Sequence, residues 1–258
     1  MIGIEHRLQA FINPSDRRAL IIDTSAGLSL GALSGLENFV PSARAILPHA
    51  NGIVCSPGQI TKLTHLDKQD AGLLVRMDWN NTLRPDSFAL PVTTPHRVPI
   101  LSAQDALDLG ASGMVITFLL GYEEALEADC LQSTVQLALE GKALGLPLVV
   151  EVQSTGPRVS LPAKAVELGV SYALEGGADV IVLPHPGTTS LKTISQFCSV
   201  PWLVKPAGLD TARAILPEIL DLGGSGLWLD HELFSRDDPA EVARDLMERL
   251  HKPVSLVR

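Results

Sequence analysis

The chain contains 258 residues, a length typical of one large α/β domain or two small ones. Its residues are 46% hydrophobic and 19% charged, which supplies a large core and excludes an intrinsically disordered chain. The formal net charge of −9 argues against nucleic acid or an anionic membrane as the main partner, because both require clustered Lys and Arg.

The three cysteines, Cys55, Cys130 and Cys198, show neither CxxC nor Cys/His spacing, so they indicate buried reduced thiols instead of disulfides or a zinc site. The N-terminal residues lack the basic region and apolar run of a signal peptide. No apolar run is long enough to span a bilayer. We therefore expect a soluble, cytoplasmic protein that needs no cofactor and binds no metal.

Apolar runs bounded by turn residues alternate with stretches of helical period along the chain. In the first half, this pattern predicts an amphipathic helix at 2–12, strands at 19–23, 52–55, 72–76 and 113–118, and helices at 37–48, after 56, and at 102–109. Residues 78–100 are rich in Pro, Asn and Thr without a clear period, which indicates an excursion over one end of the fold.

The second half continues the alternation more regularly. It predicts strands at 147–152, 178–183, 202–205 and 226–229, and helices at 121–144, 162–176, 188–197, 210–221 and 239–250. The strands are continuous apolar runs, which indicates a parallel sheet covered by helices on both faces. Eight strand–helix units predict a (β/α)8 TIM barrel, with a short N-terminal helix, as a single domain over residues 1–258.

Polar side chains stand where the predicted strands end, which is where such barrels build their active sites. The strand-end set is Asp23, Cys55, Arg76, Asp78, Thr117, Glu151, Gln153, His185, Lys205, Asp230, His231 and Glu232. A buried charge costs several kcal/mol unless it is paired, so this many charges at strand ends predict a wet, functional pocket.

Lys205 ends the short buried strand in Val200–Gly208, and Pro206 breaks the strand directly after it. An amine in this position can form an imine with a carbonyl compound if burial or a neighbouring cation keeps it partly neutral. Asp23 and Glu151 would favour the ammonium form, and His185 and Arg76 would offset them.

Structural interpretations remain open for several of these residues. Glu151 could form an ion pair with Lys205 or Arg76, and Arg76 could instead balance Asp78. His185 lies between two prolines and could be a rigid surface turn. The segment 230–232 could be a solvated loop.

Four segments resemble the class I aldolase barrels of the archaeal-type fructose-bisphosphate aldolase and amino-dideoxy-heptulosonate synthase group. They are residues 21–23 with Gly27 and Gly31, residues 102–111, residues 224–234, and Asp238-Pro239. The resemblance spans nearly the whole chain, and it implies that Asp23 is the catalytic aspartate.

The chain departs from that family at several positions. The resemblance places the imine-forming lysine of the sixth barrel strand at Val182, the proton-relaying tyrosine near Gln153, and the phosphate-binding Gly-Arg pair at Asp230-His231. The segment Lys205-Pro-Ala-Gly208 is similar to the seventh strand of deoxyribose-phosphate aldolases, where this lysine assists a second one. The resemblance therefore implies that any imine in this chain forms on Lys205.

We predict a class I aldolase-type lyase that acts on a small, sugar-like ketone or aldehyde carrying at most one phosphate, since Asp230 would repel phosphate. Lys205 would be the nucleophile and Asp23 the proton-transferring acid/base, with Glu151 or His185 as a second acid/base. The expected substrate-binding residues are Arg76, Gln153, Gly208, Asp230 and His231. We also expect a homo-oligomer.

Two alternatives remain open at this point. One is an enzyme without an imine, in which Asp23, Asp78, Glu151 and Asp230 hold a divalent cation. The other is a non-catalytic aldolase-like barrel that binds a small molecule.

Overall fold

The computed structural model describes residues 2–64 and 71–252. Its strands form a closed barrel in the order β1-β10-β9-β8-β7-β6-β3-β2, and every neighbouring pair is parallel. The barrel strands are β1 (Ala19–Asp23), β2 (Gly52–Cys55), β3 (Gly72–Arg76), β6 (Gly113–Leu119), β7 (Leu148–Gln153), β8 (Val180–Pro184), β9 (Trp202–Lys205) and β10 (Gly226–Leu229). This arrangement confirms the predicted (β/α)8 barrel.

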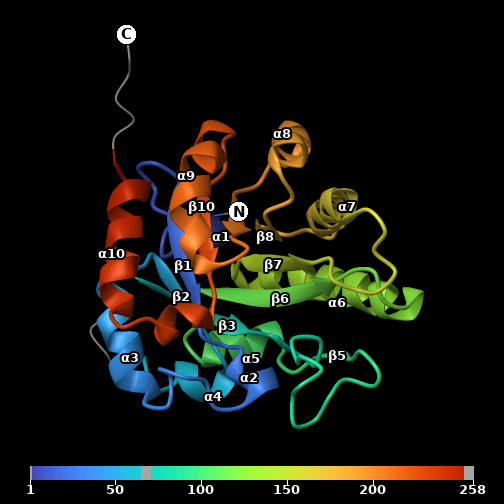
Figure 1. Ribbon diagram of the computed structural model, residues 1–258, viewed down its shortest axis with the longest axis horizontal. Coiled ribbons are helices and arrows are strands. Elements are labelled where there is room, and N and C mark those ends of the chain that lie inside the picture. The colour runs from blue at the N-terminus through green and yellow to red at the C-terminus, as the bar shows by residue number, and fades with distance from the viewer. Residues whose placement is uncertain (1, 65–70, 253–258) are drawn as a thin grey trace.

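Helices surround the barrel on its outside (Figure 1). The helices are α1 (Ile2–Leu8), α2 (Gly27–Leu30), α3 (Phe39–Ile46), α4 (Pro57–Ile60), α5 (Ala103–Asp108), α6 (Glu124–Leu144), α7 (Pro162–Glu175), α8 (Thr188–Phe197), α9 (Ala212–Asp221) and α10 (Pro239–Leu250), with 3-10 turns η1 (Leu47–His49), η2 (Leu209–Thr211) and η3 (His231–Ser235). The predicted helix at 210–221 begins as η2 and becomes α-helical only at Ala212. The predicted N-terminal helix ends at Leu8 and not at residue 12, because the chain turns there to bury Phe11.

The core has two layers, as continuous apolar strands require. Outward-facing strand residues pack under the helices, while inward-facing ones fill the barrel itself. The inner layer includes Phe11, Ile21, Val54, Leu74, Val115, Val149, Val182, Leu203 and Trp228. Because both faces of each strand are buried, the sequence shows unbroken apolar runs instead of alternation.

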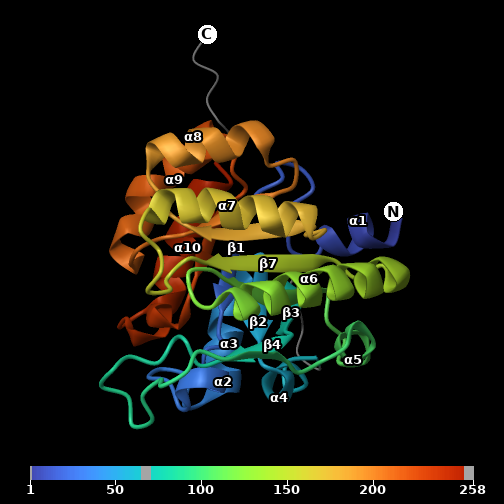
Figure 2. The same cartoon turned by 90° about the vertical axis from the view of Figure 1, so that its right-hand side faces the viewer.

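Phe11 closes the floor of the barrel. A Cβ added to Gly72 would lie 2.8 Å from the Cβ of Phe11, and one added to Gly52 would lie 3.1 Å from it. Glycine at these strand starts therefore makes room for the base of the Phe11 side chain. Figure 2 shows α1 at this end of the barrel and the loop between β4 and β5 extending at the other.

The predicted excursion at 78–100 contains a two-stranded antiparallel sheet of β4 (Asp78–Asn80) and β5 (Arg97–Pro99). Two side chains of the excursion bond to the backbone of α2. The indole Nε1 of Trp79 donates to the carbonyl of Leu28 at 2.9 Å, and Nε of Arg84 donates to the carbonyl of Ser29 at 3.0 Å. These bonds hold the excursion over α2, next to the carboxyl end of β1.

Within residues 2–64 and 71–252, no helix is both long and apolar enough to cross a membrane.

Candidate active site

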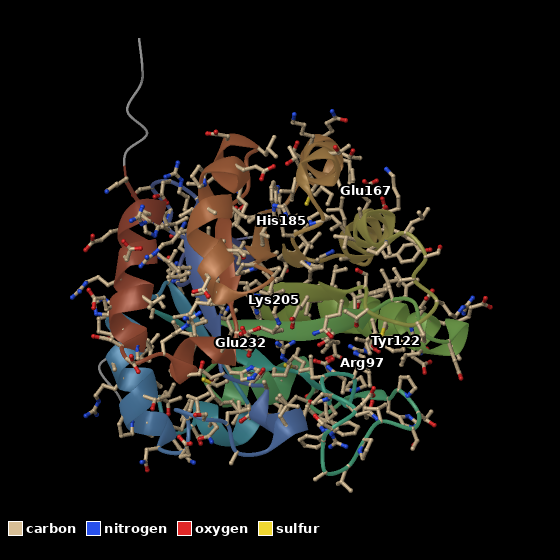
Figure 3. All side chains as sticks on the ribbon, in the orientation of Figure 1. Arg97, Tyr122, Glu167, His185, Lys205 and Glu232 are labelled. Atoms are coloured by element: carbon tan, nitrogen blue, oxygen red, sulfur yellow. The ribbon has the colours of Figure 1, made fainter. Side chains whose placement is uncertain are left out.

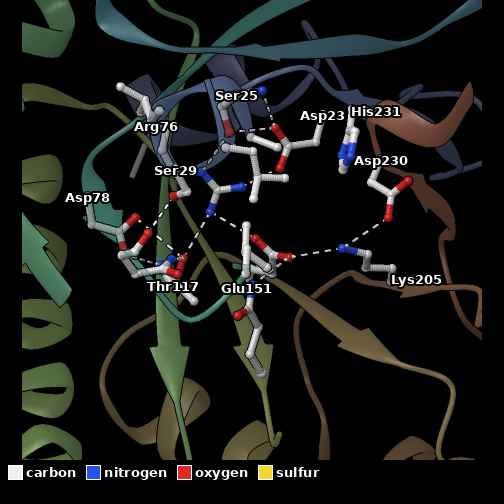
Figure 4. Close-up of a pocket in the computed structure, with 16 residues that line it drawn as sticks. Asp23, Ser25, Ser29, Arg76, Asp78, Thr117, Glu151, Lys205, Asp230 and His231 are labelled. Atoms are coloured by element: carbon white, nitrogen blue, oxygen red, sulfur yellow. Dashed lines mark hydrogen bonds and ion pairs between the residues drawn. The ribbon is translucent and has the colours of Figure 1, made fainter. Parts of the chain in front are cut away.

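A polar cavity of about 120 Å³ opens at the carboxyl ends of the strands, shown in Figure 4. It brings together most of the predicted site residues, namely Asp23, Arg76, Glu151, Gln153, Lys205, Asp230 and His231. They come from the ends of five strands, β1, β3, β7, β9 and β10, or from the residues directly after them, so closure of the barrel assembles them.

Arg76 lies at the centre of this polar cavity, with only 8% of its side chain exposed. Its Nη2 pairs with Oδ2 of Asp23, and its Nη1 lies 2.8 Å from Oε2 of Glu151. Its Nε donates to Oγ of Ser25 at 3.0 Å, and Nη1 donates to Oγ1 of Thr117 at 3.2 Å. One guanidinium thus links the ends of β1, β3 and β7.

This pairing keeps Arg76 and Glu151 charged. Burial lowers the pKa of Arg76, but the charges of Asp23 and Glu151 outweigh it and hold the pKa above its usual value. Burial conversely raises the pKa of Glu151, and the charges of Arg76 and Lys205 overcome it, so the pKa of that carboxyl stays below its usual value. Glu151 is therefore a carboxylate at neutral pH.

Lys205 faces two carboxylates. Its Nζ lies 3.3 Å from Oδ2 of Asp230 and 3.8 Å from Oε1 of Glu151, which also accepts a hydrogen bond from Nε2 of Gln153 at 3.2 Å. Burial lowers the pKa of Lys205, but Glu151, Asp230 and Asp23 together hold the pKa above its usual value. The resting side chain is consequently an ammonium, so any nucleophilic role requires a proton acceptor beside it.

A second cavity of about 400 Å³, which we call the apolar cleft, adjoins the polar cavity at Lys205. Its lining residues are Thr82, Leu83, Glu151, Val152, Gln153, Thr155, Val182, Leu183, Pro184, His185, Lys205, Pro206 and Ala207. Leu83, Glu151, Gln153 and Lys205 line both spaces. The amine therefore stands at the boundary between a charged lobe and a hydrocarbon lobe.

His185 and Gly208 are the predicted site residues that lie outside the polar cavity. His185 lines the apolar cleft, where its Nδ1 accepts from the backbone N–H of Gly187 at 3.3 Å (Figure 3). Its Nε2 lies 3.6 Å from Oε2 of Glu218 on α9, so its partner comes from a helix and not from the mouth. Gly208 lines a third cavity, together with Lys205, Asp230 and Glu232.

Two sets of contacts at the mouth of the barrel were missed by sequence reasoning. Asp78 pairs with Arg97 of the excursion at 2.9 Å, with both side chains almost fully buried, so its ion-pair partner is Arg97, and its charge acts on Arg76 less strongly than those of Asp23 and Glu151. The same Asp78 oxygen accepts the backbone N–H of Thr117 at 3.1 Å.

Ser25 donates to Asp23 through both its backbone N–H and its hydroxyl. An aspartate two residues before a serine is a common turn pattern, and it is the one signal that could have found Ser25.

The carboxylates proposed as a cation site are separated by basic groups. Asp23 and Glu151 contact Arg76, Asp78 contacts Arg97, and Asp230 contacts Lys205. Across the described ranges, no group of three or more His, Cys, Asp or Glu side chains is arranged to hold a metal ion.

A (β/α)8 barrel whose mouth holds a lysine among carboxylates fits the class of aldolase barrels. Residues 17–215 match the DeoC/LacD family aldolase, and the chain therefore belongs to that family. The matched range includes Asp23, Arg76, Glu151 and Lys205 and stops before Asp230.

Individual relatives are distant but match over most of their length. The 2-amino-3,7-dideoxy-D-threo-hept-6-ulosonate synthase of Halobacterium salinarum is 27% identical over 244 residues, which is 92% of this chain and 88% of that protein. A Schiff base-forming fructose-1,6-bisphosphate aldolase superposes with a TM-score of 0.79 at 20% identity, covering 96% of this chain and 100% of the other. An archaeal fructose-1,6-bisphosphate aldolase whose catalytic lysine is bound to a carbinolamine superposes with a TM-score of 0.78 at 20% identity, covering 96% and 99%.

The central role of Arg76 generates a stability prediction. Arg76→Met leaves two buried carboxylates without their shared cation, so we expect the free energy of unfolding at pH 7 to fall by about 3–5 kcal/mol. Exposed Arg213, which pairs with Asp245 at 2.7 Å, is the matched control, and Arg213→Met should cost about 0–1 kcal/mol. Urea unfolding of both variants measures the difference.

The loss in Arg76→Met should shrink as the pH falls towards 4. In the wild type, the folded pKa of Glu151 is lowered, so the stability it contributes is lost as the pH falls through that value. In the variant, the charge of Arg76 no longer opposes the effect of burial on Glu151, so the folded pKa of Glu151 is raised. The variant therefore gains stability as the pH falls through that pKa. A pH-independent loss would contradict the assignment of Arg76 as the partner of Glu151.

Proposed function

We propose that the protein is a class I aldolase in which Lys205 forms an imine with the carbonyl of a small, sugar-like substrate. The observation that carries this proposal is the position of its Nζ, at the junction of two cavities and within 3.3 Å of Asp230 and 3.8 Å of Glu151. Family membership and the barrel fold shared with a lysine-dependent aldolase support it.

The proposed reaction begins with proton transfer from the Lys205 ammonium to Asp230 or Glu151. The neutral amine attacks the carbonyl carbon, the same carboxylate returns its proton to the carbonyl oxygen, and that oxygen leaves as water to give the protonated imine. Asp23 accepts the proton of the substrate hydroxyl as the carbon–carbon bond breaks, and the bond's electron pair moves towards the imine nitrogen to form an enamine. The proton that Asp23 has taken returns, relayed through Glu151 or His185, to the enamine carbon, and water then hydrolyses the imine.

Substrate binding is proposed for residues around this amine. Arg76 and Gln153 hold Glu151 and present N–H groups in the polar cavity, and His231 lines the same space. Gly208 and Asp230 line the third cavity beside Lys205. The many hydrogen-bonding groups suit a hydroxylated substrate, which supports a place in cytoplasmic carbohydrate metabolism.

Borohydride trapping tests the proposed nucleophile. Incubation with a panel of small hydroxyketones and hydroxyaldehydes, followed by reduction, should add the mass of the reduced substrate to the peptide that contains Lys205. Lys205→Ala should abolish the adduct, while Lys192→Ala on the outer helix α8 should leave it unchanged. Peptide mass spectrometry reads the result, and absence of an adduct with every panel member would reject the imine.

A second candidate is a barrel that binds its ligand without catalysis. The raised pKa of Lys205 favours it, because a persistent ammonium can bind an oxygen anion but cannot attack a carbonyl. Ligand binding that survives borohydride treatment without any covalent adduct would support this candidate over the imine.

Asp230 provides a pH test of the imine mechanism. Because Asp230 helps to hold the pKa of Lys205 above its usual value, Asp230→Asn should lower that pKa and raise the fraction of neutral amine at a given pH. The curve of trapping rate against pH should move to lower pH. Asp210→Asn removes an exposed carboxylate that pairs with Arg236 and should leave the curve in place. A curve that moves to higher pH in Asp230→Asn would contradict the proposed electrostatics.

The homo-oligomer expected from the sequence is also proposed, with α6 as its contact surface. Leu131, Val135 and Leu139 recur every fourth residue and expose 40%, 38% and 60% of their surfaces, so they form an apolar stripe along one helix face. Light scattering should show a multimer that dissociates in Leu139→Glu, while Leu161→Glu on another exposed leucine should remain assembled. A monomeric wild-type protein would contradict the proposal.

A further inference from the structure

The apolar cleft is larger than the polar cavity, and it is not explained by the chemistry proposed for Lys205. Its volume is about 400 Å³, within the range of small-molecule sites, against about 120 Å³ for the polar cavity. Val182, Leu183 and Pro184 of β8 line it, Leu83 of the excursion lines it as well, and most of its open lining surface is apolar. A space lined in this way suits carbon chains better than hydroxyl groups.

Strand register explains why the cleft adjoins the amine. Lys205 pairs with Pro184 on β8, and Val182 pairs with Glu151 on β7. A carbonyl carbon bonded to Nζ of Lys205 lies at the boundary of the two lobes, so a ketone can place one substituent in each. One substituent then meets the charged groups around Arg76, and the other enters the apolar cleft.

The charges in the third cavity disfavour the binding of a phosphate there. In (β/α)8 enzymes, a phosphate is frequently bound by the loops after the last two barrel strands and the start of a short helix. Here that space is the third cavity, and its lining within the described chain includes the carboxylates of Asp230 and Glu232 with Lys205 as its one cation. Arg236, at the end of η3, pairs with Asp210 at 2.8 Å and does not line this cavity.

We infer that the carbonyl compound bound by Lys205 is unphosphorylated and carries a short alkyl chain or apolar ring, which lies in the cleft over Val182 and Leu183. Its opposite substituent carries a hydroxyl group that faces Asp23 and Arg76. This inference rests on the proposed imine, and it narrows the substrate to a hydroxyketone with one apolar arm.

A matched ligand series tests the inference. Hydroxyacetone, 1-hydroxyheptan-2-one and dihydroxyacetone phosphate share a hydroxymethyl ketone and differ in the other arm, which is a methyl group, a pentyl chain or a phosphate ester. We expect half-maximal borohydride trapping of 1-hydroxyheptan-2-one at a concentration roughly 10- to 100-fold below that of hydroxyacetone, because four methylene groups leave water. Of the three ketones, dihydroxyacetone phosphate should require the highest concentration for half-maximal trapping.

Variants of residues that line the cleft test whether the preference for the pentyl ketone arises there. Leu83→Asp places a carboxylate in the cleft and should remove most of the preference for the pentyl ketone. Leu90→Asp is the matched control on the same excursion, because Leu90 is 67% exposed and does not line the cleft. Ala207→Trp, at an exposed position on the rim, should fill the cleft and weaken the pentyl ketone selectively, while Ala207→Ser should not.

The outcomes separate this inference from the imine itself. Adducts on Lys205 that form most readily with dihydroxyacetone phosphate, or equally with all three ketones, would overturn the apolar arm and leave the imine intact. If no ketone gives an adduct, the imine fails, and titration calorimetry of Lys205→Met with 1-hydroxyheptan-2-one and hydroxyacetone still tests the cleft. Tighter binding of the pentyl ketone that is lost in Leu83→Asp would support the cleft as a binding site, and equal binding would reject it.

Discussion

The mouth of the barrel depends on the buried contact of Arg76 with Asp23 and Glu151. It joins the ends of β3, β1 and β7 and places one cation between two carboxylates that are almost closed to water. Transfer of each ion from water costs several kcal/mol, so these groups are stable in this place only as a set. Hydrogen bonds from Arg76 to Ser25 and Thr117 complete the set and fix the positions of the carboxylates around the cavity.

The same contact decides the electrostatics of Lys205. Glu151 gives one oxygen to Arg76 and presents the other to Lys205 at 3.8 Å, while Asp230 lies closer to the amine at 3.3 Å. The guanidinium of Arg76 already pairs with two carboxylates, so Asp230 interacts mainly with Lys205. The charge of Asp230 contributes to the raised pKa of Lys205. The carboxylate that favours the ammonium is also its nearest proton acceptor, and it can therefore serve the first step of imine formation.

The barrel and its strand-end residues could be predicted because both have local signals. A continuous apolar run marks a strand buried on both faces, and the first charged residue at its end, such as Asp23 or Glu151, marks the mouth. The pairing of these side chains has no local signal. Arg97 lies in an excursion without periodicity, so its contact with Asp78 could not be foreseen. The direction of His185 towards α9 depends on the turn after β8, which the strand pattern does not specify.

The position of the amine on β9 instead of β8 accounts for the division of the site into two lobes. Val182 occupies the place that the family resemblance assigns to a lysine, so β8 presents hydrocarbon to the mouth where that resemblance expects a charge. Lys205 reaches the same region from the adjacent strand, and the charged lobe around Arg76 remains on its other side. A ligand that covers the apolar lining of the cleft removes that surface from water and gains about 25 cal/mol for each Å² covered. A ligand held at the amine gains that energy only if one of its arms is apolar.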